Sequence, residues 1–263
     1  MACGDSRAVV SRTSNGVIEQ GRKASRSDTA LLSLSHAAGG VDGTAYTVAS
    51  PLGVTAGAIV GRLTGGGRVT ATRAVEPTHD RAACKPFVET VLPTRADGVG
   101  DAVVWLVGVA TGPADNAPRR ILLKLGGCRL FPRVQRVAAG GTVLVSSLDA
   151  MTSRLRFSDA SRANALRETV RFNDAGQVVP TSLVAATPGL IEVRDDLHPW
   201  VHGWLAVTPH PFVAVTTDDG QFRFDGVPPG TYTLVAWSET LGTQSRAVRS
   251  IGGIETRVAL KFE

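Results

Sequence analysis

Two short strands and two turns are predicted by T-D-D-G-Q-F-R-F-D-G-V-P-P-G-T-Y-T-L, residues 217–234. Apolar and polar side chains alternate strictly in Q-F-R-F and in T-Y-T-L, as in strands with one buried face. We therefore expect four side chains to point inward: Phe222, Phe224, Tyr232 and Leu234. D-D-G is typical of a tight turn, and V-P-P-G ends one strand and begins the next because proline fixes the bend.

The same rhythm runs from Gly57 to the C-terminus. Short runs rich in β-branched and aromatic residues, such as A-I-V-G-R-L, A-V-V-W-L-V-G-V and T-V-L-V-S-S, are separated by Gly, Pro and Asp. Regularly spaced short strands are typical of β-sandwiches. The only helix that the pattern favours is a short one in A-S-R-A-N-A-L-R-E-T, with Ser161 as its cap. The predicted fold class is all-β.

The composition is that of an ordinary globular protein. The 263 residues are 43% hydrophobic and 19% charged, which suits one large core or two modest ones. The formal net charge is +5, but basic residues such as Arg119 and Arg120 come in ones and twos, not in a stripe with aromatic residues. We therefore expect no nucleic acid partner. No apolar run predicts a membrane-spanning helix, and the N-terminal residues lack the pattern of a signal peptide.

Residues 1–56 differ from the rest of the chain. They are rich in Ser, Thr, Ala and Gly and show no sustained apolar period, so they cannot bury enough surface to fold by themselves. We expect an extended arm that lies across neighbouring subunits of a complex; the alternative is that it packs on its own globular part. Cys3 stands in M-A-C-G-D, which resembles the start of a mature bacterial lipoprotein. It is a candidate lipid anchor or an ordinary cysteine.

The densest group of reactive side chains is V-R-D-D-L-H-P-W-V-H-G-W, residues 193–204. On a strand Asp195 and Asp196 would point to opposite faces, which makes them a poor acid–base pair. The chain also lacks a G-x-S-x-G elbow and a phosphate-binding loop, so we expect no enzyme. A zinc site is an alternative, although His198 and His202 would be about 13 Å apart on a strand. Its donors would come from Asp195, Asp196, His198, His202 and His210.

Two families resemble parts of this sequence. Residues 217–234 resemble the turn and hairpin of carboxypeptidase regulatory-like domains, which are transthyretin-like β-sandwiches, and the upstream runs G-A-I-V-G-R-L and D-A-V-V-W-L-V resemble their opening strands. These upstream runs precede residues 217–234 by roughly a hundred residues, which implies a domain inserted between them. The resemblance thus assigns residues 57–117 and 208–263 to the transthyretin-like sandwich. The insert, residues 118–207, resembles a cupredoxin through R-I-L-L-K-L-G-G-C-R-L-F-P and V-R-D-D-L-H-P-W-V.

The second of these segments resembles the copper loop C-x-x-H-P-x-M of amicyanin-like cupredoxins. Blue copper needs a thiolate, two imidazoles and a weak axial thioether. The resemblance places Asp195 at the thiolate position and Val201 at the thioether position, retains His198 as one imidazole, and puts the other at or next to Ser153. Arg154 would add a guanidinium beside the site and repel a cation. We therefore expect degenerate copper positions and no cofactor.

The combined resemblance is to bacterial periplasmic cupredoxin-like proteins. It implies a periplasmic, membrane-associated, non-enzymatic subunit that docks on a membrane-bound electron-transfer complex and stabilises it. A photosynthetic reaction centre with its antenna is the expected partner, with a respiratory complex as a second fit. The alternative function is a periplasmic copper-binding electron carrier with an altered site. The resemblance also implies a disulfide between Cys84 and Cys128; two buried free thiols are the alternative.

Overall fold

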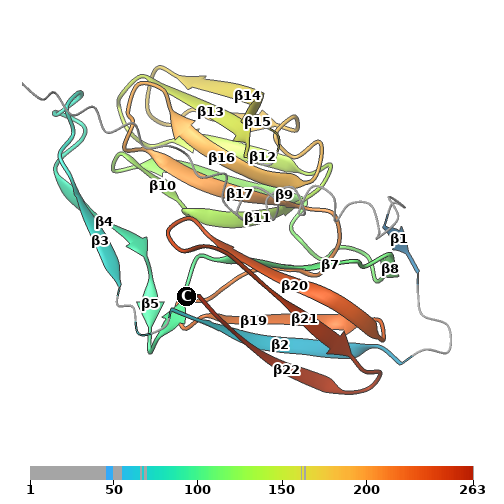
Figure 1. Ribbon diagram of the computed structural model, residues 1–263. Helices are drawn as coiled ribbons and strands as arrows, with labels where there is room; N and C mark the ends of the chain where they lie inside the picture. Colours follow the sequence, from blue (N-terminus) through green and yellow to red (C-terminus); the bar gives the residue numbers. More distant parts are fainter. Residues whose placement is uncertain are drawn as a thin grey trace, which may run out of the picture.

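The computed structural model describes residues 46–49, 55–65, 67, 70–160, 162 and 164–262. These residues form β-strands and no helix, so the fold class is all-β, as predicted (Figure 1). Accordingly, none of them belongs to a helix that could span a membrane. The helix expected at residues 160–169 is wrong, because β14 (Ala165–Phe172) pairs as a strand with β13 (Ser153–Asp159). Ser161, its expected cap, lies outside the described residues.

The first β-sandwich is built from strands at both ends of the described chain. Its two sheets have the orders β18-β7-β20-β21 and β19-β2-β6-β5, with β22 paired to β2. Two further pairs lie beside it, the parallel pair β1–β8 and the antiparallel pair β3–β4. The strands are β1 (Thr47–Val48), β2 (Gly57–Thr64), β3 (Ala71–Val75), β4 (Phe87–Leu92), β5 (Thr94–Arg95), β6 (Gly98–Val99), β7 (Val103–Val107), β8 (Thr111–Gly112), β18 (Val213–Val215), β19 (Gln221–Val227), β20 (Gly230–Ser238), β21 (Gly242–Ser250) and β22 (Glu255–Lys261).

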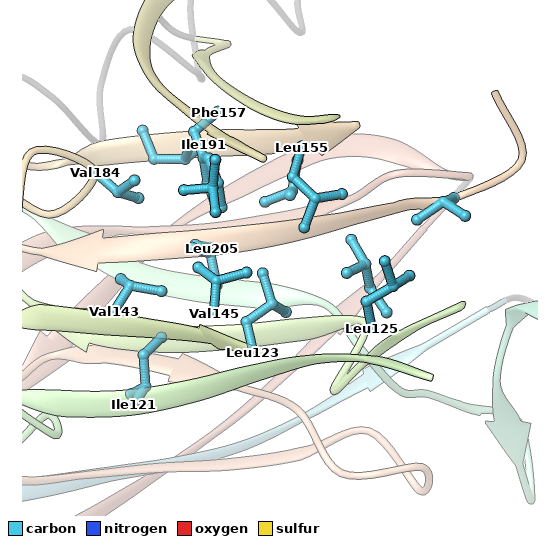
Figure 2. Packing of buried hydrophobic residues seen from close by; sticks show 14 of the residues in the cluster. Ile121, Leu123, Leu125, Val143, Val145, Leu155, Phe157, Val184, Ile191 and Leu205 are labelled. Carbon is cyan, nitrogen blue, oxygen red and sulfur yellow. The ribbon is translucent and has the colours of Figure 1, made fainter. Parts of the chain in front are cut away.

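The second β-sandwich is continuous in sequence, from β9 to β17. Its sheets have the orders β10-β9-β12-β15 and β11-β17-β16-β13-β14. Figure 2 shows its core, where Leu123 and Val145 of one sheet point toward Ile191 and Leu205 of the other. Besides β13 and β14, the strands are β9 (Arg120–Gly126), β10 (Arg129–Phe131), β11 (Val134–Ala138), β12 (Thr142–Ser147), β15 (Val178–Thr181), β16 (Gly189–Asp195) and β17 (His202–Thr208).

The alternating stretch at residues 217–234 supplies β19 and β20. Phe222, Phe224 and Leu234 are buried in the core of the first sandwich, and Tyr232 packs partly buried against the same core, as the alternation predicts. Gly220 completes the D-D-G turn at φ 79°, where a side chain would also collide with the main chain of Leu63.

The two strands of this stretch do not form the hairpin that the resemblance implies. Strand β19 pairs with β2, whereas β20 pairs with β7 in the facing sheet. The V-P-P-G segment therefore connects the two facing sheets. Pro228 and Pro229 have no N–H groups, so they cannot donate to a neighbouring strand. The Tyr232 hydroxyl donates to the Pro228 carbonyl over 2.9 Å and anchors this crossing.

The two sandwiches stack through a third apolar cluster, so the four main sheets form four layers. Trp204 of β17 meets Trp237 of β20 edge to face, with ring centroids 4.7 Å apart. The outward faces of β7 and β11 contribute further apolar side chains. Strands β10-β9-β12-β15 and β19-β2-β22 are consequently the outermost layers.

The β3–β4 pair stands at the side of both sandwiches (Figure 1). Its connection, residues 76–86, reaches the second sandwich, where Cys84 and Cys128 form a disulfide with their Cα atoms 5.6 Å apart. Glu89 of β4 also lies 3.7 Å from Arg133 of the second sandwich. We call residues 76–86 the cap loop.

Candidate functional site

The residues at the expected copper positions lie together at one end of the second sandwich. Ser153 begins β13, Asp195 ends the neighbouring β16, and His198 and Val201 follow in the loop to β17. All four residues are buried. The loop closes on itself, since Val201 N donates to the His198 carbonyl and Asp195 N donates to the Val201 carbonyl.

Asp195 is the centre of this site, and its carboxylate accepts four hydrogen bonds. Its Oδ2 accepts from Ser153 Oγ at 2.5 Å and from His198 Nδ1 at 2.9 Å. Its Oδ1 accepts from the main-chain N–H groups of Arg154 at 3.1 Å and Leu197 at 2.9 Å. A carboxylate that is only 2% exposed requires such donors, because burial without them is costly.

The imidazole of His198 joins Asp195 to the cap loop. Its Nε2 lies 2.8 Å from Oδ2 of Asp80, whose side chain is half exposed. Burial lowers the pKa of His198, but the hydrogen bonds to Asp80 and Asp195 outweigh it, so the pKa is raised above its usual 6.5. Trp200 packs edge-on against the His198 ring, with centroids 5.3 Å apart.

The sequence-based reasoning missed Asp80. It is far from residues 193–204 in the sequence, and nothing in its own segment resembles a metal ligand. One signal could have found it: Asp80 stands four residues before Cys84 in D-R-A-A-C, so a disulfide to Cys128 would bring it to the second sandwich.

This donor set does not fit blue copper. A hydroxyl, a carboxylate and an isopropyl group stand where an imidazole, a thiolate and a thioether are required. Both ring nitrogens of the remaining imidazole, His198, already have carboxylate partners. We therefore derive no electron-transfer step at these positions.

The alternative zinc donors do not converge either. His202 Nε2 lies 2.7 Å from Arg133 and 3.2 Å from Glu239, at the junction of the sandwiches. His210 is fully buried elsewhere; its Nδ1 accepts from Phe212 N at 3.2 Å, and burial lowers its pKa to about 4. Within the described part of the chain, no three His, Cys, Asp or Glu side chains form a group that could hold a metal.

The expectation for Arg154 is wrong. Its guanidinium turns away from Asp195 and pairs with Asp196, over 3.0 Å, and only its main-chain N–H reaches the buried carboxylate. Arg156 pairs with the same Asp196 carboxylate at 3.1 Å. The reason is strand alternation. Asp195 points inward and Asp196 points outward, so the two carboxylates face opposite sides, as expected from the sequence.

The cap loop covers the site beside the disulfide. Its His79 ring lies 6.3 Å from that of Trp200, and Asp80 reaches His198. The sulfur of Met151 is 3.4 Å from Cys84 Sγ and 3.8 Å from Cys128 Sγ. Cys3, the candidate lipid anchor, lies outside the described residues, as does most of the N-terminal arm.

Among the comparisons with known proteins, only the one with solved structures found similar chains. No protein-family model and no curated protein matches the sequence. The chain is similar to a reduced Cu(I) form at pH 4 of a proline-to-glycine mutant of amicyanin, with 19% identity and a TM-score of 0.29, over 36% of this chain and 84% of that one. It is also similar to the Cu(I) form of a methionine-to-alanine mutant of amicyanin, with 16% identity and a TM-score of 0.30, over 40% of this chain and 97% of that one. Similarity of this extent says nothing about a site or an activity.

Proposed function

We propose that this chain is a non-enzymatic structural subunit that docks on the extracytoplasmic face of a membrane-bound electron-transfer complex. The observation that carries the proposal is the closed cluster of Ser153, Asp195, His198 and Asp80. Its polar groups are bonded to one another, and it offers neither the thiolate nor the free imidazoles of a copper carrier. A sandwich of this kind is a rigid body suited to protein contacts.

The surface best suited to docking is the outer face of strands β10-β9-β12-β15. Figure 2 shows Ile121 and Leu123 pointing into the core. Leu122 between them therefore points outward, and it is 38% exposed. Phe131 of β10 and Val178 of β15 are also exposed on this outermost layer, at 46% and 55%. We call Leu122, Phe131 and Val178, with their neighbours on these strands, the β9 face.

The charges around the β9 face favour a protein partner with acidic residues. Arg120 and Lys124 are exposed on β9 on either side of Leu122. On the opposite outer layer, by contrast, Arg223 pairs with Asp225 and Glu255, so its charges already have partners. Apolar side chains surrounded by basic ones suit a partner surface with an apolar centre and an acidic rim. Such complementary charges orient the two proteins and raise their association rate.

The test is co-purification of the tagged full-length chain from its own membranes in mild detergent. Variant Leu122→Asp/Phe131→Asp should lose the polypeptides that the unaltered chain retains. Variant Ile254→Asp is the matched control, since Ile254 is 51% exposed but lies before β22 on the first sandwich. Equal melting temperatures would show that all three chains are folded. Retention of the same polypeptides by the β9-face variant would contradict the proposal.

The eluate also identifies the partner. We propose a photosynthetic reaction centre with its antenna, so the unaltered chain should retain photosynthetic pigment. A haem spectrum without pigment would indicate a respiratory complex instead.

A further inference from the structure

We propose that Cys84, Cys128 and Met151 form a site for Cu(I) when the disulfide is reduced. The three sulfurs lie beneath the cap loop, and the three residues are at most 3% exposed. None of them occupies a degenerate copper position. The inference goes beyond the docking function and does not depend on it.

The positions of the sulfurs approach those of a three-coordinate metal site. Metal–sulfur bonds of about 2.3 Å in a trigonal arrangement separate the sulfurs by about 4 Å. The Met151 sulfur is already 3.4 Å from Cys84 Sγ and 3.8 Å from Cys128 Sγ. Only the two cysteine sulfurs must move apart, which rotation of their side chains allows once the bond between them is broken.

Contacts other than the disulfide hold the two cysteines in place. The Asp149 carboxylate accepts the main-chain N–H groups of Gly127 and Cys128, each at 2.8 Å. The main-chain N–H of Cys84 donates to the Asp80 carbonyl at 2.8 Å, and the Asp80 side chain binds His198. Reduction therefore leaves the ligands near one another.

The reductant would be a dithiol, such as the active site of a thiol–disulfide oxidoreductase. The dithiol supplies two electrons and two protons, becomes a disulfide, and leaves Cys84 and Cys128 as thiols. Cu(I) then binds two thiolates and the thioether and displaces the two thiol protons. Soft sulfur ligands of this kind favour Cu(I), zinc and iron–sulfur clusters, and a set of three sulfurs suits Cu(I) better than tetrahedral zinc. Arg81, Ala82 and Lys85 around Cys84 are exposed, whereas the sulfurs are buried, so reduction requires local opening of the cap loop.

The experiment uses the full chain carrying Cys3→Ser, so that Cys84 and Cys128 are its only cysteines. The chain is reduced with a phosphine without oxygen, the phosphine is removed by gel filtration, and Cu(I) is partitioned between the chain and a chromophoric Cu(I) chelator. We expect one Cu(I) per reduced chain and none on the oxidised chain. Adding Met151→Leu, a change of similar volume, should weaken binding by at least about tenfold, since even outer-shell partners of a metal contribute that much.

Two results would overturn the proposal. One is a reduced chain that takes up no more Cu(I) than its oxidised form; the other is an affinity that Met151→Leu leaves unchanged. X-ray absorption of the Cu(I)-loaded chain gives a readout that needs no further variant. Three sulfur neighbours support the site, and a shell of nitrogen or oxygen contradicts it.

Discussion

Replacing Asp195 by alanine should destabilise the protein strongly, because this carboxylate satisfies four donors at a buried position. The change leaves Ser153 Oγ, His198 Nδ1 and two main-chain N–H groups without their acceptor. Each buried polar group left unpaired costs about 1–3 kcal/mol. Counting only the two side-chain donors, we expect a loss of about 4 kcal/mol in the free energy of unfolding.

The assay is urea denaturation followed by tryptophan fluorescence. With a slope of about 3 kcal/mol per molar urea, the midpoint should fall by about 1.3 M. The matched control is Asp196→Ala at the next position, whose carboxylate meets the half-exposed Arg154 and Arg156 and should cost less than about 1 kcal/mol. Equal losses for the two variants would refute the view that Asp195 is the centre of a buried cluster.

Three further predictions concern the contacts around the site. Cys84→Ser/Cys128→Ser should lower the free energy of unfolding by about 4 kcal/mol, from the chain entropy of a 44-residue separation, and calorimetry against the unaltered chain with its disulfide intact would measure it. Because the pKa of His198 is raised in the folded chain, protonated His198 adds to the free energy of unfolding. This contribution is fully present below the pKa of the unfolded chain, about 6.5, and is lost as the pH rises through the pKa of the folded chain. Melting temperatures across this range should show the decline in the unaltered chain and lose it in His198→Gln. Trp204→Ala should remove about 3–5 kcal/mol from the contact between sandwiches, and a single calorimetric transition at an unchanged temperature would contradict it.

The strands were predictable because alternation is a local property. Phe222, Phe224 and Leu234 are buried as their spacing predicts. Which strand pairs with which is decided over long distances, so the resemblance of residues 217–234 to a hairpin did not predict the V-P-P-G crossing between sheets. The same limit explains β14, where local helix propensity gave way to pairing with β13.

The candidate site was predictable in its positions but not in its contacts. The resemblance to a copper loop placed Ser153, Asp195 and His198 together, and they are in direct contact. It could not reveal Asp80, because the contact between Asp80 and His198 depends on the cap loop, which connects β3 and β4 and is not part of the second sandwich. The expectation for Arg154 overlooked strand alternation, which places the residue after the buried Ser153 on the opposite face of β13.

The proposed function depends most on the hydrogen bonds among Ser153, Asp195, His198 and Asp80, which leave no ligands for copper. The most direct measurement is a Cu(II) titration of the purified chain with its disulfide intact, followed by metal analysis after gel filtration and by visible absorption. We predict far less than one copper per chain and no thiolate-to-copper band. Stoichiometric copper retained by the oxidised chain, and lost in His198→Gln, would contradict the account and favour the electron carrier.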